Sequence, residues 1–377
     1  MKEILNFLIE VGKLKKMPRT GFVWLGIKNP ETIAQHCFRV AILNWILGKK
    51  VKPRLNLEKI IKMSIGHELC EIYAGDMTPY WGLLPRDSKK RKEILKRWIR
   101  LPKKVKEKRD KIKFLKEKKG LQKLIQNLEP RIKKDIFDTW VEYEKMNSRE
   151  GRFVKQGEKI ETLLQALEYW GPEPDTPVFG WWEEVEDLVD NPILLEFLKK
   201  IEKRFYKKEK INGELNFLLE MGKLKTMPRT SWVLQKVNNP ETIAEHAFLL
   251  TIASWILGQE KRLNLEKLLK MSLIYEICEV YAGDATPYDG LAPGSKIKEV
   301  LKRWPRFLQK EKRFFKDYQK EKKALKKVIA GLPTDLQKEM IDLWSQCKMQ
   351  KTIEGNFVNQ VYWLVTYLQA LQYFQKK

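Results

Sequence analysis

The sequence predicts an all-α fold made of two tandem helical domains. Apolar residues recur at steps of three and four through most of the chain, which places them on one face of a helix. No alternating run long enough for a convincing strand interrupts this pattern. Residues 6–48 align with residues 216–258 at a constant offset, so the chain carries one domain twice rather than a short solenoid repeat.

The elements follow in order from this pattern. The opening stretch MKEILNFLIEVGKLKK is amphipathic and predicts a helix, and its return as GELNFLLEMGKLK at 213–225 argues against a targeting peptide. The stretch ETIAQHCFRVAILNWIL at 31–47 keeps helical spacing, and Pro30 marks its start. The related stretches SIGHELCEIYAGDMTPY at 64–80 and SLIYEICEVYAGDATPY at 272–288 each predict a helix that a glycine ends.

The boundary between the two copies is expected near residue 210. Prolines and glycines in GPEPDTPVFGWWEEVEDLVDNP at 171–192 indicate a loop, followed by helices that lead into the second copy. We therefore expect a first domain at 1–209, in which 171–209 form a tail and linker helices, and a second domain at 210–377.

Composition narrows the class of protein. Hydrophobic residues at 43% and aromatic residues at 11% are enough for packed cores and argue against global disorder. No apolar run approaches the roughly 20 residues that cross a bilayer, so no membrane association is expected. The four cysteines lack C-x-x-C spacing and indicate buried thiols in a reducing, cytoplasmic setting. The net charge of +25 favours polyanions as partners through electrostatics that carry no sequence information.

Three residues of the first copy form the centre of a candidate metal site. His36 lies on the second expected helix, and His67 and Glu68 are adjacent on a later one. Imidazole together with carboxylate suits a divalent cation. Glu71 follows three and four positions beyond the pair, on the same helix face, where a carboxylate can act as general acid or base.

Two further carboxylates complete the candidate site. Gly75 is expected to end the helix, so that Asp76 turns toward the mouth of the site with Thr78 close behind it. Glu158, a charged residue in an increasingly apolar helical stretch, is the candidate fourth ligand. An alternative stays open, because histidines and helix carboxylates also occur as ordinary core and surface residues without a metal.

Longer motifs in the same order resemble a known family. The stretch GKLKKMPRTGFVWLGIKNPETIAQH, the pattern H-[DE]-x-x-E-x-x-x-G-D-x-x-P and the later segments EYE, FVKQGEKIE and LQALEY resemble the HD-domain 5′-deoxynucleotidases. The likeness covers residues 1–205 and, less faithfully, 213–377. It implies an all-helical, metal-dependent phosphohydrolase that acts on nucleoside 5′-monophosphates with Mn²⁺, Co²⁺, Mg²⁺ or a similar ion. Because family members resemble symmetric dimers, it also implies that the two copies form an internal pseudo-dimer.

The resemblance also implies roles for individual residues. The implied metal ligands are His36, His67, Glu68 and Glu158. The implied catalytic residues are Glu71 and Asp76, and the implied substrate contacts are Arg19, Phe22, Asp76 and Thr78. The first copy departs from the family where Glu68 and Glu158 replace aspartates, which moves each carboxylate outward by a methylene. Metal shells tolerate only small errors in distance, so weak metal binding, a different ion or lost turnover all stay open.

The second copy departs further from the family. It keeps most of the corresponding residues, namely Arg229, Trp232, His246, Glu276, Glu279 and Asp284. Tyr275 and Tyr362, however, occupy two of the four ligand positions. A neutral tyrosine is a poor ligand for these ions, so we expect a degenerate site without hydrolysis. Because Arg229 and Trp232 are retained, nucleotide or phosphate binding there stays open.

Two basic segments support a second hypothesis. Residues 89–123 hold 18 basic and 4 acidic side chains, and residues 296–327 form a milder counterpart. The aromatic residues interleaved with these cations are Trp98, Phe114, Phe314 and Phe315. Cations and aromatic rings together are typical of surfaces that bind RNA or DNA, although a charged run is also an ordinary solvated helix face. The alternative to the phosphohydrolase is thus an inactive, basic scaffold for RNA, DNA or a ribonucleoprotein.

Overall fold

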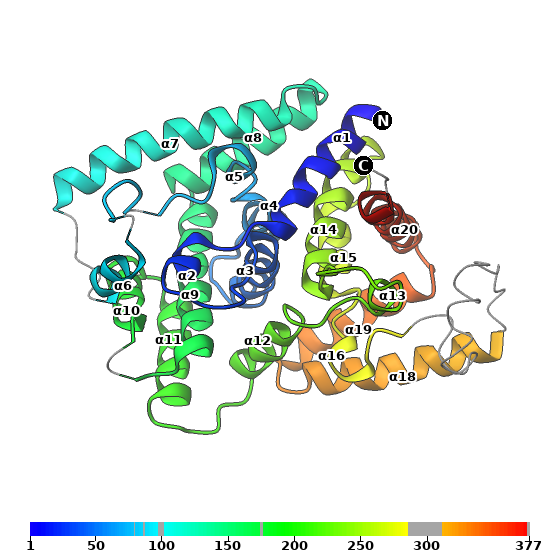
Figure 1. Ribbon diagram of the computed structural model, residues 1–377. Coiled ribbons are helices and arrows are strands. Elements are labelled where there is room, and N and C mark those ends of the chain that lie inside the picture. Colours follow the sequence, from blue (N-terminus) through cyan, green and yellow to red (C-terminus); the bar gives the residue numbers. More distant parts are fainter. Residues whose placement is uncertain (79, 86, 97–101, 174–175, 286–310, 375–377) are drawn as a thin grey trace. The chain divides into compact units, whose positions relative to one another are not determined.

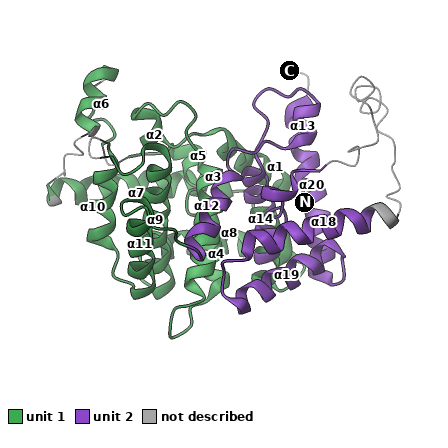
Figure 2. Cartoon of the chain, turned by 90° about the horizontal axis from the view of Figure 1, so that it is seen from below, with its two compact units in different colours: residues 1–211, 251–269 green, residues 212–250, 270–377 purple. Residues whose placement is uncertain are grey.

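The structure is a computed structural model that describes residues 1–78, 80–85, 87–96, 102–173, 176–285 and 311–374. Two compact units divide the chain, as Figure 2 shows: unit 1 comprises residues 1–211 and 251–269, and unit 2 comprises residues 212–250 and 270–377. Both units are helical, and two isolated bridges, Pro18–Thr32 and Pro228–Thr242, are the β pairing within the described residues. The all-α prediction is confirmed.

The described helices of the second copy follow the order of their counterparts in the first copy, which also has α10 and α11 at its end (Figure 1). Those of residues 1–211 are α1 (Lys2–Val11), the 3₁₀ helix η1 (Gly12–Lys16), α2 (Thr20–Trp24), α3 (Ile33–Gly48), α4 (Leu57–Gly66), α5 (Glu71–Ala74), α6 (Ser88–Lys96), α7 (Lys103–Ile125), α8 (Pro130–Lys145), α9 (Arg149–Trp170), α10 (Val178–Leu188) and α11 (Pro192–Phe205). Those of residues 212–377 are α12 (Glu214–Lys223), α13 (Thr230–Leu234), α14 (Ile243–Glu260), α15 (Leu265–Ile274), α16 (Glu279–Ala282), α18 (Glu311–Ile329), α19 (Thr334–Lys348) and α20 (Ile353–Phe374).

Helix α3 forms the core of unit 1. All of its 16 residues are buried, and it packs against α4 and α9. A capping box fixes its start, because the Thr32 hydroxyl accepts from the Gln35 amide while the Gln35 side chain accepts from the Thr32 amide. The polar residues His36 and Arg39 lie inside this buried helix. Each therefore needs a hydrogen-bond partner or a ligand.

The segment between α4 and α5 differs from the expected continuous helix. α4 ends at Gly66 and α5 begins at Glu71, so His67 and Glu68 lie in a tight turn between them. The Leu69 amide donates to the Gly66 carbonyl at 3.2 Å, and the Glu71 amide donates to the Glu68 carbonyl at 3.0 Å. These bonds span three residues instead of four, which tightens the backbone and changes where each side chain points.

The described parts of the basic segments are helical. Most of 89–123 lies in α6 and α7, and residues 311–327 of the second segment lie in α18. Helix α7 packs against α5. Residues 97–101, which include Trp98, lie outside the described residues, as do residues 296–310. Of the other interleaved aromatic residues, Phe114 stacks on Trp140 at a centroid distance of 5.2 Å, Phe314 on Tyr318 at 6.4 Å, and Phe315 is 56% exposed.

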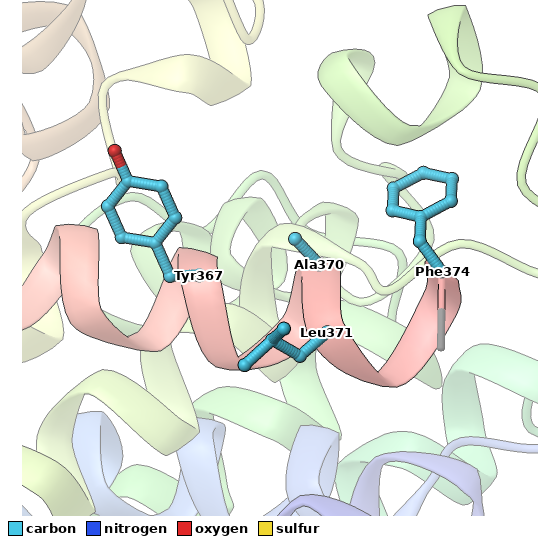
Figure 3. Close-up of a pocket in the computed structure, with 4 residues that line it drawn as sticks. All are labelled: Tyr367, Ala370, Leu371 and Phe374. Atoms are coloured by element: carbon cyan, nitrogen blue, oxygen red, sulfur yellow. The ribbon is translucent and has the colours of Figure 1, made fainter. Parts of the chain in front are cut away.

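Helices α9 and α20 correspond to one another but differ in their surfaces. In unit 1, α10 and α11 pack on α9, and Leu163 and Leu167 are buried. In α20 the corresponding residues Tyr367 and Leu371 are 59% and 55% exposed. Together with Ala370 and Phe374 they line a hollow on the surface of the helix (Figure 3). None of these four lining residues belongs to the predicted sites.

The cysteines lie in the core, as expected from their apolar sequence context. Cys37, Cys70, Cys278 and Cys347 are all buried as thiols rather than disulfides. Within the described part of the chain, no helix has both the length and the apolar character that crossing a membrane requires.

Candidate metal centre

Three of the predicted ligands meet in unit 1. One ligand atom from each of His36, His67 and Glu68 lies within 4.8 Å of the other two. His36 comes from α3, whereas His67 and Glu68 come from the turn between α4 and α5. The two imidazole centroids are 5.4 Å apart, and His67 Nε2 lies 3.6 Å from Glu68 Oε1. The break after α4 is what turns both residues of the adjacent pair toward α3.

The hydrogen bonds of the two histidines leave the same nitrogen available on each. His67 Nδ1 lies 2.9 Å from the carbonyl oxygen of Ser64, which can only accept, so Nδ1 carries the proton. His36 Nδ1 lies 2.5 Å from Glu161 Oε2, and a carboxylate selects the same tautomer. Both Nε2 atoms are buried without a hydrogen-bond partner among the residues described. Burial lowers the pKa of His67 to about 4, so its imidazole is neutral, the form that binds metals.

Glu158 lies beside this cluster on α9. Its Oε1 is 3.8 Å from His36 Nε2, and its side chain is almost fully buried. Burial acts to raise the pKa of Glu158, but nearby cations, foremost Lys159 and Lys155, outweigh it and lower that pKa to about 2. An ionised carboxylate thus adjoins the two imidazoles. Two imidazoles and two carboxylates are a donor set that fits a divalent cation.

Glu71 and Glu68 form a carboxyl pair with one proton. Glu71 is 1% exposed, and burial, followed by the charges of Glu68 and Asp76, raises its pKa well above the usual range. Burial also acts to raise the pKa of Glu68, but the nearby cations Arg19 and Lys113 and a hydrogen bond from Glu71 hold that pKa well below the usual range. Glu71 is therefore the protonated member of the pair, and its hydroxyl donates a hydrogen bond to the Glu68 carboxylate.

Arg19 adjoins the same carboxylates. Its Nη1 donates to Glu68 Oε1 at 3.0 Å and its Nη2 donates to Thr162 Oγ1 at 3.5 Å. The same Nη2 lies 3.9 Å from Glu158 Oε1. A guanidinium in this place provides a cation next to the predicted ligands.

Asp76 holds the segment that carries Arg19. Its Oδ2 accepts a hydrogen bond of 2.6 Å from the amide of Thr20, the residue after Arg19. The second copy keeps this bond, because Asp284 Oδ2 accepts from the Thr230 amide at 2.6 Å. The carboxylate thus has a structural role in both copies.

The other two predicted substrate contacts lie in different surroundings. Phe22 is 2% exposed, and its ring centroid lies 5.1 Å from that of Tyr169 and 5.4 Å from that of Trp181. Its ring is therefore covered by other aromatic residues rather than open to a base. Thr78 follows Asp76 closely, and its buried hydroxyl has no partner within the described part of the structure.

In the second copy, two phenols stand where the first copy has two of the predicted ligands. Tyr275 and Tyr362 lie with ring centroids 4.9 Å apart. Burial raises the pKa of Tyr275 to about 12 and that of Tyr362 well above its usual range, so both hydroxyls keep their protons. Asn359 donates a hydrogen bond of 2.9 Å to the Tyr275 hydroxyl. Neutral phenols supply neither the negative charge of the Glu158 carboxylate nor the ring nitrogen that the neutral His67 imidazole offers in unit 1.

Arg229 is enclosed by its neighbours. It is 4% exposed and donates to Glu276 and, at 2.5 Å, to the Tyr362 hydroxyl. Its Nε lies 3.4 Å from Asp284 Oδ2. The guanidinium that corresponds to Arg19 is thus surrounded by groups of the protein itself.

The remaining residues of the second copy are also buried. His246 Nδ1 lies 3.2 Å from Glu241 Oε1, which also accepts from Trp232 Nε1 at 2.9 Å. Trp232 is 5% exposed. Burial, followed by the charges of Glu276 and Asp284, raises the pKa of Glu279 well above its usual range, as in its counterpart Glu71.

The sequence did not single out Arg39 and Glu161, which adjoin His36 in the structure. Arg39 Nε donates to Glu161 Oε1 at 2.7 Å, and both side chains are fully buried. A signal for them was present, because Leu249 and Val365 occupy the corresponding positions of the second copy. Charged residues that a repeat replaces by apolar ones merit attention as site residues.

Comparison with known proteins identifies the family. The HD domain model of the family HD_3 matches residues 11–180 and 221–377, one segment in each copy. The chain therefore belongs to the HD domain family, and the resemblance seen in its motifs is confirmed.

The chain is also similar to individual proteins. The chain is 30% identical over 168 residues to the 5′-deoxynucleotidase HDDC2 of Homo sapiens, which covers 45% of this chain and 69% of the relative. It is 33% identical over 174 residues to the 5′-deoxynucleotidase HDDC2 of Dictyostelium discoideum, which covers 45% of this chain and 78% of the relative. Among solved structures, a conserved hypothetical protein from Pyrococcus furiosus matches 52% of this chain and 98% of its own, with 24% identity and a TM-score of 0.37.

Proposed function

We propose that unit 1 is a metal-dependent phosphohydrolase that acts on nucleoside 5′-monophosphates, with deoxynucleotides as the preferred class. The observation that carries the proposal is the cluster of His36, His67 and Glu68, whose ligand atoms lie within 4.8 Å of one another. Membership of the HD domain family and the relatives named 5′-deoxynucleotidase support hydrolase activity and supply the substrate class.

The donor set determines which residues would hold the metal. These are His36, His67 and Glu68, with Glu158 as the fourth ligand. Mn²⁺, Co²⁺ and Mg²⁺ are the candidate ions, because they accept imidazole or carboxylate ligands. When bound, such an ion polarises the phosphoryl oxygens and orients a water molecule. Because Glu68 and Glu158 are each one methylene longer than aspartate, the affinity for each ion is the first quantity to measure.

Glu71 is the residue proposed to move a proton. Its raised pKa favours the protonated form, which donates a hydrogen bond to Glu68. A buried carboxylic acid of this kind is suited to protonate the leaving 5′-oxygen as the phosphoester bond breaks.

The substrate contacts are assigned from charge and hydrogen-bonding capacity. Arg19 is proposed to bind the phosphate, because its planar guanidinium matches phosphate oxygens. Asp76 is proposed to place the water or the sugar, in addition to holding the Arg19 segment. The buried Thr78 hydroxyl is available to bond the substrate. Phe22 is proposed to anchor the segment that carries Arg19 by packing against its aromatic neighbours.

Unit 2 is proposed to be an inactive partner of unit 1. The phenols of Tyr275 and Tyr362 keep their protons and replace two ligands. Arg229 is paired with Glu276 and Tyr362, which leaves it less suited than Arg19 to bind phosphate.

Three further expectations stand as proposals. The two domains are proposed to divide at residues 209 and 210, and to form an internal pseudo-dimer. The protein is proposed to act in the cytoplasm, a reducing compartment that suits four buried thiols.

The test is a phosphate-release assay on the full chain. Ribo- and deoxynucleoside 5′-monophosphates are each incubated with Mn²⁺, Co²⁺ or Mg²⁺, and inorganic phosphate is measured. We expect release that is faster for deoxynucleotides and that His67→Ala abolishes, while the matched variant His246→Ala in the second copy retains it. Wild-type protein that binds none of these ions and releases no phosphate would refute the proposal. Release that survives His67→Ala would refute the site assignment.

A second candidate function is polyanion binding by α7. The observation that favours it is the run of exposed lysines along this helix, among them Lys104, Lys108 and Lys111. Other cations of α7 already have partners, since Lys116 lies 3.6 Å from the Trp81 ring and Lys113 lies 3.3 Å from Glu117. The surface proposed for nucleic acid is therefore the exposed N-terminal half of α7.

A further inference from the structure

A buried ion network holds the Nδ1 side of His36. Glu161 Oε2 lies 2.5 Å from His36 Nδ1, while Glu161 Oε1 accepts a hydrogen bond of 2.7 Å from Arg39 Nε. Arg39 also donates to Glu168 at 2.5 Å and to Gln165 at 2.9 Å. His36, Arg39 and Glu161 are each 0% exposed. Side chains from α3 and α9 are thus arranged around one imidazole.

The second copy keeps the histidine and lacks the network. Leu249, Val365 and Gln372 stand at the positions of Arg39, Glu161 and Glu168. Leu249 is 1% and Val365 0% exposed, so apolar side chains fill the same core positions. His246 Nδ1 instead lies 3.2 Å from Glu241 Oε1. The loss of the network coincides with the loss of two metal ligands.

This contrast indicates that the fold does not need the charges. Apolar residues of similar volume often replace a buried ion pair without loss of stability, and Leu249 with Val365 is such a replacement. Stability therefore does not explain why Arg39 and Glu161 are present in the first copy. Histidines that bind metals commonly donate their other ring N–H to a carboxylate, which fixes the tautomer and the ring orientation.

We infer that Glu161, held in place by Arg39, positions His36 for metal binding. The inference rests on the metal site of the proposed function. Glu161 follows Glu158 by about one turn of α9, so one helix carries both a ligand and the carboxylate that orients another ligand. The bond to Glu161 draws Nδ1 toward α9 and leaves Nε2 3.8 Å from Glu158 Oε1.

Glu31 is the competing acceptor for His36. Its Oε1 lies 3.8 Å from His36 Nδ1, and its counterpart Glu241 is the partner of His246 in the second copy. Without Glu161, the imidazole is expected to turn toward Glu31. That rotation moves Nε2 away from its place beside Glu158.

The test uses the full chain with Arg39→Leu and Glu161→Val, the pair that the second copy already buries. Affinity for Mn²⁺ and Co²⁺ is measured by titration calorimetry. We expect it to fall about 10- to 100-fold, the usual effect of removing such a partner. The unfolding midpoint of the metal-free variant is expected to stay close to that of the wild type. Unchanged affinity would overturn the inference.

Two single variants complete the design. Glu161→Gln keeps the shape of the side chain and decides the matter if the double variant does not fold; a loss of about 10-fold is expected, and none overturns the inference. Glu168→Gln is the matched control, because Glu168 pairs with Arg39 rather than with His36. Its metal affinity is expected to match the wild type, and a loss as large as that of Glu161→Gln would overturn the inference, because the effect would then not depend on the bond between Glu161 and His36.

A readout in the metal-free protein separates this inference from the proposed function. The chain has three histidines, so ¹⁵N-histidine labelling gives few ring signals. The Nδ1 proton of His36 takes part in the shorter hydrogen bond, so we expect its chemical shift farther downfield than that of the His246 Nδ1 proton. In the double variant, the His36 shift is expected to move toward the value of His246. A His36 signal that stays in place overturns the inference. Wild-type protein that binds no metal overturns the proposed function instead.

Discussion

Arg229 Nη2 donates a hydrogen bond of 2.5 Å to the hydroxyl of Tyr362. At the corresponding place in unit 1, Arg19 Nη2 lies 3.9 Å from Glu158 Oε1. Exchange of one carboxylate for a phenol therefore alters both a proposed metal ligand and the pairing of the arginine proposed to bind phosphate. The two copies thus differ in charge while their backbones keep the same turn, as the Thr20–Asp76 and Thr230–Asp284 bonds show.

The first prediction concerns metal stoichiometry. Because Tyr275 and Tyr362 are neutral phenols, we expect one divalent ion per chain, bound in unit 1. Elemental analysis after dialysis should find about one ion in wild-type protein and in His246→Ala, and none in His67→Ala. Two ions per chain would contradict the proposal that the second site is degenerate.

The second prediction separates proton transfer from metal binding. Glu71→Gln keeps the size of the side chain but removes the carboxyl proton that the raised pKa of Glu71 favours. Phosphate release should fall by about 10²- to 10⁴-fold, the usual contribution of a general acid or base. The Mn²⁺ affinity, measured in parallel, should stay within a few-fold of the wild type. A loss of affinity that matches the loss of rate would instead make Glu71 a ligand.

The third prediction concerns the stability of the metal-free protein. Burial lowers the pKa of His67 from 6.5 to about 4, so the unfolded chain binds a proton in this range that the folded chain does not. The neutral His67 stabilises the folded state by at most about 3 kcal/mol. This contribution is complete above pH 6.5 and is lost as the pH falls toward 4. His67→Asn should remove that loss, as urea unfolding at several pH values would show.

Wild type and His67→Asn must be compared because other buried groups change the free energy of unfolding with pH in the opposite direction. Burial raises the pKa of Glu117 to about 7 and that of Glu71 well above its usual range. Their contributions are present at low pH and are lost as the pH rises. They are common to wild type and variant, so the difference between the two curves isolates His67. Parallel curves would show that His67 is not buried as a neutral imidazole.

The fourth prediction tests polyanion binding by α7. Lys104→Glu, Lys108→Glu and Lys111→Glu together should weaken binding to duplex DNA and reduce its salt dependence, by about 0.9 in log–log slope for each phosphate that the protein no longer neutralises. Fluorescence anisotropy at several salt concentrations measures this. Charge reversal of three exposed cations on α11, Lys199, Lys203 and Arg204, is the matched control. A slope equal to that of the control would leave α7 as an ordinary solvated helix.

Much of the fold was predictable because helices record their packing in the spacing of apolar residues. The helix around His36 and the glycine at the end of α5 follow from such local signals, and Gly75 has the positive φ of 77° that favours glycine. The repeat identified the residues that differ between the copies. The break after Gly66 was missed, because the same apolar pattern also suits a continuous helix.

The sequence by itself determined the fold class, the duplication, the HD domain family and the residue types available for a metal. Only the tertiary structure decided that Glu161, rather than Glu158, bonds His36 Nδ1, and that Arg229 is enclosed by its own copy. The physical reason is that spacing along a helix fixes which side chains share a face. Which faces then meet, and which nitrogen of an imidazole is left for a ligand, depends on packing between segments that lie far apart in the chain.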